Sequence, residues 1–549
     1  MIASDIFLLG ALALFLLAWC WPGLPRRSAL LWLSANVVVT SGGYGVFVDR
    51  WQAGGGLLLG LLWLVVLFFS GRRQGGRRSG VPYLSALVFV MLAAVAVAPI
   101  YLFPVDRLPP PSGLHAVGVR DFELVDAQRR GVLGAPADAP RRLLVRVWYP
   151  AKPTTGAEPR PYFTAAEAGS TARGFGTLLG FPPLLSHLRH ITSNAYEDAP
   201  VATSDGKLPV VFFSHGYASY TAANSALMED LASHGYAVYS VQHSGDASPT
   251  LLPDGEVVPM DPGLVEHMHH VFGAGLPEVM VRGYSSADLD ERLDGQLRTA
   301  LEIPPPGSRG IALSAPVWLA DRLFVHDRLQ VGTVPASVAD LVAASDFTRT
   351  GEMGMSFGGS TAGAVCMVDS RCAAAINLDG GDFHFLAFGD ELPVPLLMFH
   401  ADLDGFYRML GVEPQGPLYG FNDFSYERFE QAGARSDIYR PVMKGSVHAG
   451  FTDNGLLLRG PLRDALAGTA PNEVLIGAAN AFVLGFLDRH LRGRDNGFPQ
   501  AQYRQYADWI APHDTSAVRR WWLAKPQSER EVIGQRLQVL PRVEHRPAR

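Results

Sequence analysis

Four apolar stretches near the start of the chain constrain its fold more than any other feature. They cover roughly 6–22, 29–48, 55–70 and 82–103, and each approaches the ~20 residues that a helix needs to cross a bilayer. We therefore interpret 1–104 as a transmembrane region of about four helices. A plain anchor is the simplest role, because no stretch carries a charged residue in its middle. A transport or sensing role is the alternative.

Arginines in the connections between these stretches indicate an orientation in the membrane. The second connection offers only Asp49 and Arg50, whereas the first and third are rich in arginine. By the positive-inside rule, the first and third connections face the cytoplasm, and the chain after residue 104 lies on the opposite side. The arginines concerned are Arg26, Arg27, Arg72, Arg73, Arg77 and Arg78.

The remainder of the chain reads as further structural units, since 549 residues exceed one ordinary core. We expect a proline-rich linker and lead-in over 105–139, a main domain over 140–495 and a C-terminal extension over 496–549. The formal net charge is -6, and the extension and main domain contain no basic block. Nucleic-acid binding therefore has no electrostatic support.

Within the main domain, apolar runs alternate with helical patterns, which indicates a mainly parallel sheet covered on both faces. Residues 249–310 interrupt this alternation and are interpreted as an inserted cap. The cap contains His267, His269 and His270, whose spacing matches no metal site, so we place them on a helix or loop surface. Strands are expected at 143–150, 208–216, 236–241, 350–355, 373–378 and 395–400.

One short motif suggests nucleophilic chemistry. Gly354-Met355-Ser356-Phe357-Gly358 matches G-x-S-x-G, follows an expected strand and precedes a helix of small residues. In such a unit the serine sits on a tight turn, and its hydroxyl projects above the sheet. We therefore predict that Ser356 is a nucleophile, the alternative being a structural glycine-rich turn.

A serine hydroxyl needs a base, an orienting acid and an oxyanion site before it reacts. His448, in a glycine-flanked loop before the last long helix, is the predicted base. Asp379 follows one strand after the serine, and Asp402 and Asp404 follow the next. Chain order alone allows any of the three to be the acid. The oxyanion donors are expected to be the backbone N–H groups of Tyr217 and Phe357.

Six segments together resemble the platelet-activating-factor acetylhydrolase family of α/β-hydrolases, including its bacterial relatives. They are RVWYPA (146–151), FFSHGYASY (212–220), VQHSGDAS (241–248), GMSFGG (354–359), INLDGGDF (376–383) and GSVHAGFTD (445–453). The likeness covers about 140–490 and leaves out the apolar region.

The resemblance implies an α/β-hydrolase fold for the main domain, which would then be a catalytic domain. It implies Asp379 as the acid, with Asp402 or Asp404 as fallback, His448 as the base, and Tyr217 and Phe357 as oxyanion donors. His215 would shape the oxyanion site. The implied activity is carboxylic ester hydrolysis, similar to a 1-alkyl-2-acetylglycerophosphocholine esterase, and it requires no metal or organic cofactor.

The sequence thus predicts a membrane-anchored serine esterase that acts through an acyl-enzyme on a lipid ester or another short acyl ester. With bacterial relatives, the expected location is the inner membrane, with the catalytic domain on the periplasmic side. The alternatives are an acyltransferase using the same residues and a non-catalytic binding or sensing module attached to the spans. Cys366 and Cys372 are expected either to form a disulfide or to remain two buried thiols.

Overall fold

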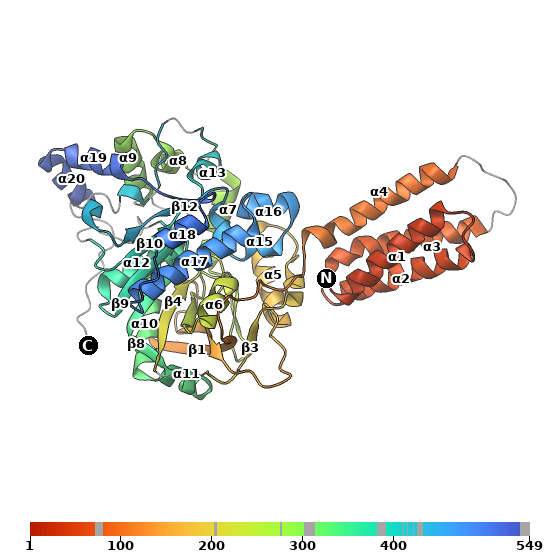
Figure 1. The fold of residues 1–549 in the computed structure, drawn as a ribbon, viewed down its shortest axis with the longest axis horizontal. Helices are drawn as coiled ribbons and strands as arrows, with labels where there is room; N and C mark the ends of the chain where they lie inside the picture. The colour runs from red at the N-terminus through yellow and green to blue at the C-terminus, as the bar shows by residue number, and fades with distance from the viewer. Residues whose placement is uncertain are drawn as a thin grey trace.

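The computed structural model describes residues 1–71, 81–202, 206–274, 277–300, 313–381, 391–409, 411–413, 416–420, 422–424 and 432–537. Within these ranges the chain forms an N-terminal bundle and a larger unit built on one main sheet, called the sheet domain below (Figure 1). Part of the expected cap (301–310) and the last residues of the expected extension (538–549) lie outside the described residues.

The N-terminal bundle contains four long helices: α1 (Ala3–Cys20), α2 (Arg27–Phe47), α3 (Gly54–Gly71) and α4 (Val81–Leu102). Each is long and apolar enough to cross a membrane, as the sequence predicts. Inside the bundle, Phe15 stacks on Trp63 with ring centroids 3.6 Å apart. Apolar side chains such as Leu58 and Val95 are 70% and 71% exposed on its outside. An apolar exterior of this kind is what contact with lipid requires.

The sheet domain is organised around nine strands in the order β11-β10-β9-β8-β4-β5-β2-β1-β3. Neighbours run parallel except where β2 pairs antiparallel with β1 and with β5, so the sheet is mainly parallel, as predicted. The strands are β1 (Ala116–Arg130), β2 (Pro140–Ala151), β3 (Ala195–Glu197), β4 (Leu208–Ser214), β5 (Ala237–Gln242), β8 (Ser345–Met355), β9 (Cys372–Leu378), β10 (Leu396–Phe399) and β11 (Ile438–Tyr439).

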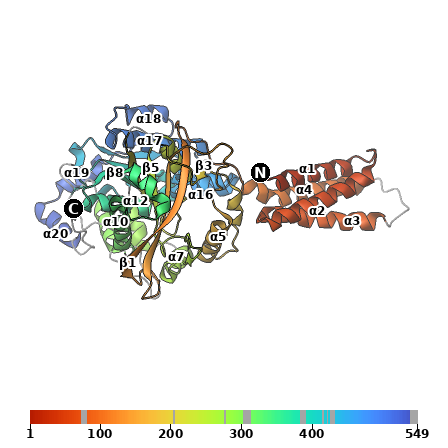
Figure 2. The ribbon, with the colours of Figure 1, turned by 90° about the horizontal axis from the view of Figure 1, so that it is seen from below.

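Helices cover both faces of this sheet (Figures 1 and 2). On one face α6 (Ser225–Ser233) and α17 (Asn472–His490) pack against Val211 and Phe213 of β4. On the other face α10 (Ala315–Val331) and α11 (Ala339–Ala344) pack against Val210 and Phe212 of the same strand. Successive side chains of a strand point to opposite faces. The uninterrupted apolar run of β4 is therefore the sequence signal of a strand buried on both sides.

Elements between and after these strands complete the domain. The inserted region includes β6 (Thr250–Leu251), β7 (Val257–Val258), α7 (Pro262–Ala274), α8 (Glu278–Ser285) and α9 (Leu289–Ala300). The final segment contains α18 (Gln500–Gln505), β13 (Ile510–Pro512), α19 (Ser516–Ala524) and α20 (Gln527–Leu537). The remaining elements are η1 (Trp51–Ala53), α5 (Ala165–Leu179), η2 (Ser186–His190), η4 (Ala336–Val338), α12 (Phe357–Val368), α13 (Leu403–Met409), η5 (Ala432–Ala434), β12 (Pro441–Met443), η6 (His448–Phe451), α15 (Asn454–Leu457) and α16 (Gly460–Ala467).

Two parts of the chain that were expected to lie outside the main domain are built into the sheet domain. Much of the expected linker and lead-in forms the sheet strand β1, and Leu108 just before it is buried and donates its N–H to Thr192. In the expected extension, β13 pairs antiparallel with β12. The three-residue strand β13 is too short to show a period, whereas the prolines before β1 draw the sequence reading toward a linker although β1 itself is 15 residues long.

The bundle and the sheet domain meet at one end of the bundle. The Arg50 guanidinium is fully buried there, 3.2 Å from the Asp5 carboxylate, and it donates to the carbonyl of Phe103 at 2.7 Å. Across the junction, the Trp51 indole donates to the carbonyl of Leu184 at 2.7 Å. Arg50 thus ties the start of α1 and the end of α4 to the α2–α3 connection, and the Trp51 bond joins that connection to the sheet domain. The first connection, between α1 and α2, therefore lies at the opposite end of the bundle (Figure 1).

Candidate active site

Ser356 lies on a sharp turn between β8 and α12. Its backbone φ and ψ are 56° and -124°, a conformation that non-glycine residues rarely adopt. A Cβ on Gly358 would lie 1.9 Å from the carbonyl oxygen of Ser214, and one on Gly354 would lie 2.1 Å from the Gly358 carbonyl carbon. Both glycines are required by this close approach of strand and helix, which explains the G-x-S-x-G pattern.

The Ser356 hydroxyl, the His448 imidazole and the Asp379 carboxylate form a continuous hydrogen-bonded series. The Nε2 atom of His448 is 2.8 Å from Ser356 Oγ, and its Nδ1 atom is 2.7 Å from Asp379 Oδ2. His448 comes from η6, far along the chain, and its side chain is 42% exposed. The structure thus brings together the predicted nucleophile, base and first-choice acid.

Asp379 is itself held firmly at the end of β9. Its residue is 5% exposed, and its Oδ1 atom accepts the backbone N–H of Ala401 at 2.8 Å. Its own backbone N–H donates to Phe399 in β10, and its φ is 56°. One carboxylate oxygen is therefore fixed by the neighbouring strand end while the other faces His448.

The two fallback acids lie elsewhere. Asp402 accepts the backbone N–H of Gly445 at 2.7 Å, and Asp404 forms an ion pair with Arg408 on the same helix. Both carboxylates therefore have partners other than the His448 ring.

The two predicted oxyanion donors flank the serine. Phe357 is the first residue of α12, directly after Ser356, and Tyr217 follows the turn at the end of β4. A Cβ on Gly216 would lie 3.4 Å from the Cβ of Ser356, and the Tyr217 and Phe357 rings are 5.4 Å apart. The Gly216 backbone thus lies beside Ser356, and Phe357 begins a helix whose N-terminal dipole favours negative charge.

Comparisons with known proteins agree with this architecture. Residues 103–252 match the model of the family described as platelet-activating factor acetylhydrolase, isoform II. The fold is that of an α/β-hydrolase. The match confirms the resemblance predicted from the sequence, and it covers the Gly216 turn but not the segments carrying Ser356, Asp379 and His448.

A solved structure shares this fold. It is the ferulic acid esterase from Streptomyces cinnamoneus, with a TM-score of 0.50, 24% sequence identity, and coverage of 75% of this chain and 100% of that one. Family match and fold together support a hydrolase of the α/β-hydrolase type that acts on esters.

A buried histidine pair in this α/β-hydrolase fold fixes the backbone before Tyr217. The His243 backbone N–H donates to Nε2 of His215 at 3.1 Å, so the His215 proton resides on Nδ1. That Nδ1–H donates to the carbonyl oxygen of Gly216 at 2.6 Å. The Gly216 carbonyl and the Tyr217 N–H belong to the same planar peptide, so this bond orients the predicted oxyanion donor. Burial lowers the pKa of His215 to about 3, which keeps the ring neutral.

Sequence reasoning missed the residues that support this pair. The His243 ring stacks on Trp318 with centroids 3.8 Å apart, and its Nδ1 is 3.0 Å from Asp321. Asp321 is fully buried and is held by Arg141 at 2.7 Å. The sequence carries little signal for Trp318 and Asp321. They lie on α10, just after the expected cap, and no motif there marks them as neighbours of the site.

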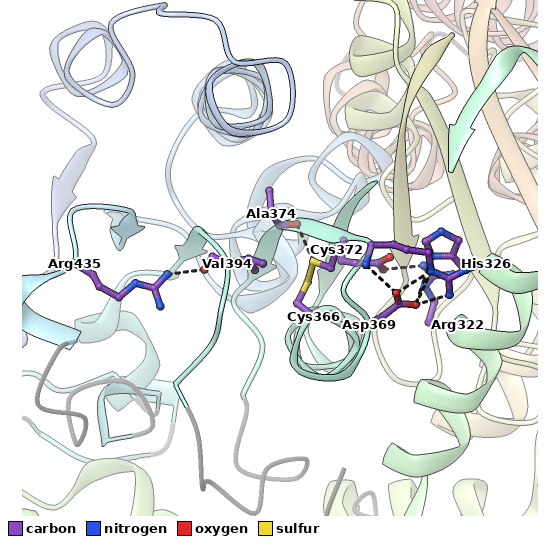
Figure 3. Close-up of a disulfide and its surroundings, with 10 residues drawn as sticks. Arg322, His326, Cys366, Asp369, Cys372, Ala374, Val394 and Arg435 are labelled. Atoms are coloured by element: carbon purple, nitrogen blue, oxygen red, sulfur yellow. Dashed lines mark hydrogen bonds and ion pairs between the residues drawn. A yellow bond between two sulfur atoms is a disulfide. The ribbon is translucent and has the colours of Figure 1, made fainter. Parts of the chain in front are cut away.

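The disulfide left open by the sequence is present at the far end of α12 (Figure 3). Cys366 on the last turns of α12 is bonded to Cys372 at the start of β9. Asp369, in the loop between them, is paired with Arg371 at 2.5 Å. The bond therefore joins the helix that begins at Ser356 to the strand that ends at Asp379.

Proposed function

We propose that this protein is a serine ester hydrolase in which Ser356, His448 and Asp379 act as a catalytic triad. The observation that carries the proposal is the hydrogen-bonded series from Ser356 Oγ through His448 to Asp379, with separations of 2.8 Å and 2.7 Å. The family match and the α/β-hydrolase fold support it.

In the proposed reaction, His448 takes the hydroxyl proton as Ser356 Oγ attacks the ester carbonyl carbon. Asp379 orients the imidazole and stabilises its charged form. The N–H groups of Tyr217 and Phe357 stabilise the oxyanion. His448 then returns the proton to the leaving alcohol, which leaves an acyl-enzyme. A water molecule, deprotonated by His448, attacks the acyl carbon and releases the carboxylic acid and free Ser356.

We further propose that α1–α4 anchor the enzyme in a bilayer, with the sheet domain outside the cytoplasm. The arginines that the sequence places in the first and third connections support this orientation. The Cys366–Cys372 disulfide supports it independently, because such bonds persist in oxidising compartments. A reporter fused after residue 110 tests the orientation, and activity of a cytoplasm-dependent reporter would contradict it.

The decisive experiment is active-site labelling with a fluorophosphonate, followed by peptide mass spectrometry on the full-length protein in detergent. Modification of Ser356 in folded protein, and its loss after heat denaturation, is the expected result. A panel of esters of graded acyl length, assayed with wild type and Ser356→Ala, then defines the preferred substrate. Unlabelled Ser356 together with ester turnover that survives Ser356→Ala would refute the proposal.

A further inference from the structure

The described part of the C-terminal extension makes contacts that the proposed reaction does not use. Helices α19 and α20 lie beside α9 of the cap (Figure 1), where the Trp521 indole donates to the Asp290 carboxylate at 3.1 Å. Arg536 of α20 donates to Asp294 of α9 at 2.9 Å. An apolar cluster of side chains from these three helices also contains Phe424, which belongs to none of them. The extension and the cap therefore pack together, and they share a third partner.

The third partner is a short stretch of chain, the described residues of 419–424, which we call the bridging segment. From the extension, His513 contacts it directly after β13, with Nε2 2.9 Å from an oxygen of the Asp423 carboxylate. From the cap, the Arg292 guanidinium donates to the carbonyl of Tyr419 at 2.8 Å. The side chains of Arg292, Asp423 and His513 are all buried, so water competes little for these contacts. The extension and the cap thus both hold the bridging segment.

Asn422 of the bridging segment contacts the residue that follows the proposed acid. It is 1% exposed, and its side-chain amide donates to the carbonyl of Gly380, directly after Asp379. A Cβ on Gly380 would lie 1.9 Å from the carbonyl oxygen of Ser356, so the two backbones are in contact. Asn422 therefore holds the peptide that lies between the proposed acid and the proposed nucleophile.

The Gly380 peptide is also held from the strand side. The Asn377 side chain of β9 accepts the Gly380 N–H at 2.6 Å and donates to the Gly380 carbonyl at 3.1 Å. This double hold matters because the backbone φ of Asp379 is 56°, a conformation that a residue other than glycine keeps only when its surroundings enforce it. Asn377 and Asn422 are two of the groups that enforce it.

We propose that Asn422 is a positioning residue for the Asp379 carboxylate, and that the C-terminal extension fixes Asn422 in place. His513 does so through Asp423, the residue next to Asn422 in the chain. Loss of either contact releases the Gly380 carbonyl on one side, and Asp379 can then turn away from the imidazole that it orients. The role in catalysis rests on the proposed function, whereas the physical connection from the extension to the end of β9 does not.

The role of Asn422 is tested by Asn422→Ala in the full-length protein in detergent, with a water-soluble ester as substrate. Because the imidazolium forms only in the transition state, we expect kcat to fall about tenfold and KM to stay unchanged. Asn496→Ala is the matched control, since the Asn496 amide also donates to a backbone carbonyl, that of Gly485 at 2.8 Å, and we expect it to keep the wild-type kcat. Fluorophosphonate titration of Ser356 to completion counts the folded sites, so a folding defect lowers the titrated amount and leaves kcat per site unchanged.

The role of the extension is tested by two replacements of His513. His513→Gln keeps a nitrogen donor near the position of Nε2, whereas His513→Leu removes it. We expect His513→Leu to lower kcat about tenfold and His513→Gln to keep most of the wild-type kcat. Combining His513→Leu with Asn422→Ala should lower kcat no further than Asn422→Ala alone, because both variants act through one contact.

Hydrogen–deuterium exchange measures the connection without turnover. In His513→Leu, the peptide 372–381 at the end of β9 is expected to exchange about tenfold faster than in wild type. In His513→Gln this peptide is expected to keep the wild-type rate. Strand β2 is expected to keep the wild-type rate in both variants, which excludes a general loosening of the fold.

The outcomes separate the two proposals. Wild-type kcat in Asn422→Ala, a change in KM alone, or equal losses in the two His513 variants overturns the positioning proposal and leaves the esterase intact. Absence of Ser356-dependent turnover by wild type refutes the esterase. The exchange result still decides the connection: unchanged exchange at 372–381 in His513→Leu overturns it, and faster exchange confined to that peptide confirms it.

Discussion

The carboxylate of Asp402 accepts a hydrogen bond from the backbone N–H of Gly445 at 2.7 Å. Gly445 lies three residues before His448, so Asp402 holds the loop that carries the proposed base. Asp379 contacts the His448 ring itself at 2.7 Å. Chain order alone could not choose between Asp379 and Asp402 as the acid. In the structure, Asp379 contacts the His448 ring, and Asp402 contacts the loop that carries His448.

The first prediction compares these two carboxylates. Asp379→Asn is expected to lower kcat by roughly 10³–10⁴, because the amide cannot stabilise the imidazolium or fix its tautomer. Asp402→Asn is expected to cost less than about tenfold, because an amide oxygen can still accept the Gly445 N–H. Steady-state kinetics with a water-soluble ester checks both. A larger loss for Asp402→Asn would reverse the assignment.

Much of the site could be predicted from sequence because its chemistry depends on local patterns. The glycines that the turn requires predict Ser356 as the nucleophile, and the place of His448 before the last long helix predicts it as the base. The choice between Asp379 and Asp402 needed the family resemblance, since both follow buried strands on the same sheet edge. Only the three-dimensional positions of β9 and β10 separate their roles.

The fold was predicted where periodicity was strong and missed where it was weak. The apolar runs at β4 and β5 gave correct strands, since a buried parallel strand is apolar throughout. Helix α5 was not predicted, although Thr164 and Glu167 form a capping box at its start. Its small residues and glycines conceal the helical period. The bracing of His243 by Trp318 is a tertiary contact with no local signal.

The second prediction concerns the elbow glycines. Gly358→Ala is expected to abolish most activity and to lower stability, because its Cβ would lie 1.9 Å from the Ser214 carbonyl oxygen. Gly405→Ala in α13 is the matched control, since its Cβ would approach other atoms no closer than 3.6 Å. Ester turnover and the thermal midpoint of both variants are to be compared. Wild-type turnover by Gly358→Ala would contradict the close packing of strand and helix.

The third prediction concerns the disulfide. Replacing Cys366 and Cys372 together by serine is expected to lower the free energy of unfolding by about 2 kcal/mol, because the loop that the bond closes is short. Denaturant unfolding of the oxidised wild type and the double variant measures the difference. Adding a reductant should bring the wild type toward the variant and leave the variant unchanged. No change in the wild type would indicate that the bond contributes nothing to stability.

The last prediction uses a buried carboxyl group away from the site. Glu229 on α6 is fully buried, and one of its oxygens accepts the N–H and the side-chain amide of Asn194 at 3.1 Å and 2.9 Å. Its other oxygen has no hydrogen-bond partner within the part of the chain that the structure describes. Burial raises the pKa of Glu229 to about 7, so the folded protein keeps this group protonated at mildly acidic pH.

The sign of the pH dependence follows from proton counting. Between the ordinary pKa of a glutamate and about 7, the unfolded chain has released this proton and the folded chain has not. The contribution of Glu229 to stability therefore falls as pH rises through this window, by about 1.4 kcal/mol per pH unit at most.

Glu229→Gln keeps both acceptor contacts and has no proton to lose. The thermal midpoint of Glu229→Gln should exceed that of wild type at pH 8 and match it near pH 4. The exposed control Glu266→Gln should differ from wild type by the same amount at both pH values. A difference that stayed constant with pH would mean that Glu229 is ionised in the folded protein throughout, and that its unpaired oxygen is solvated.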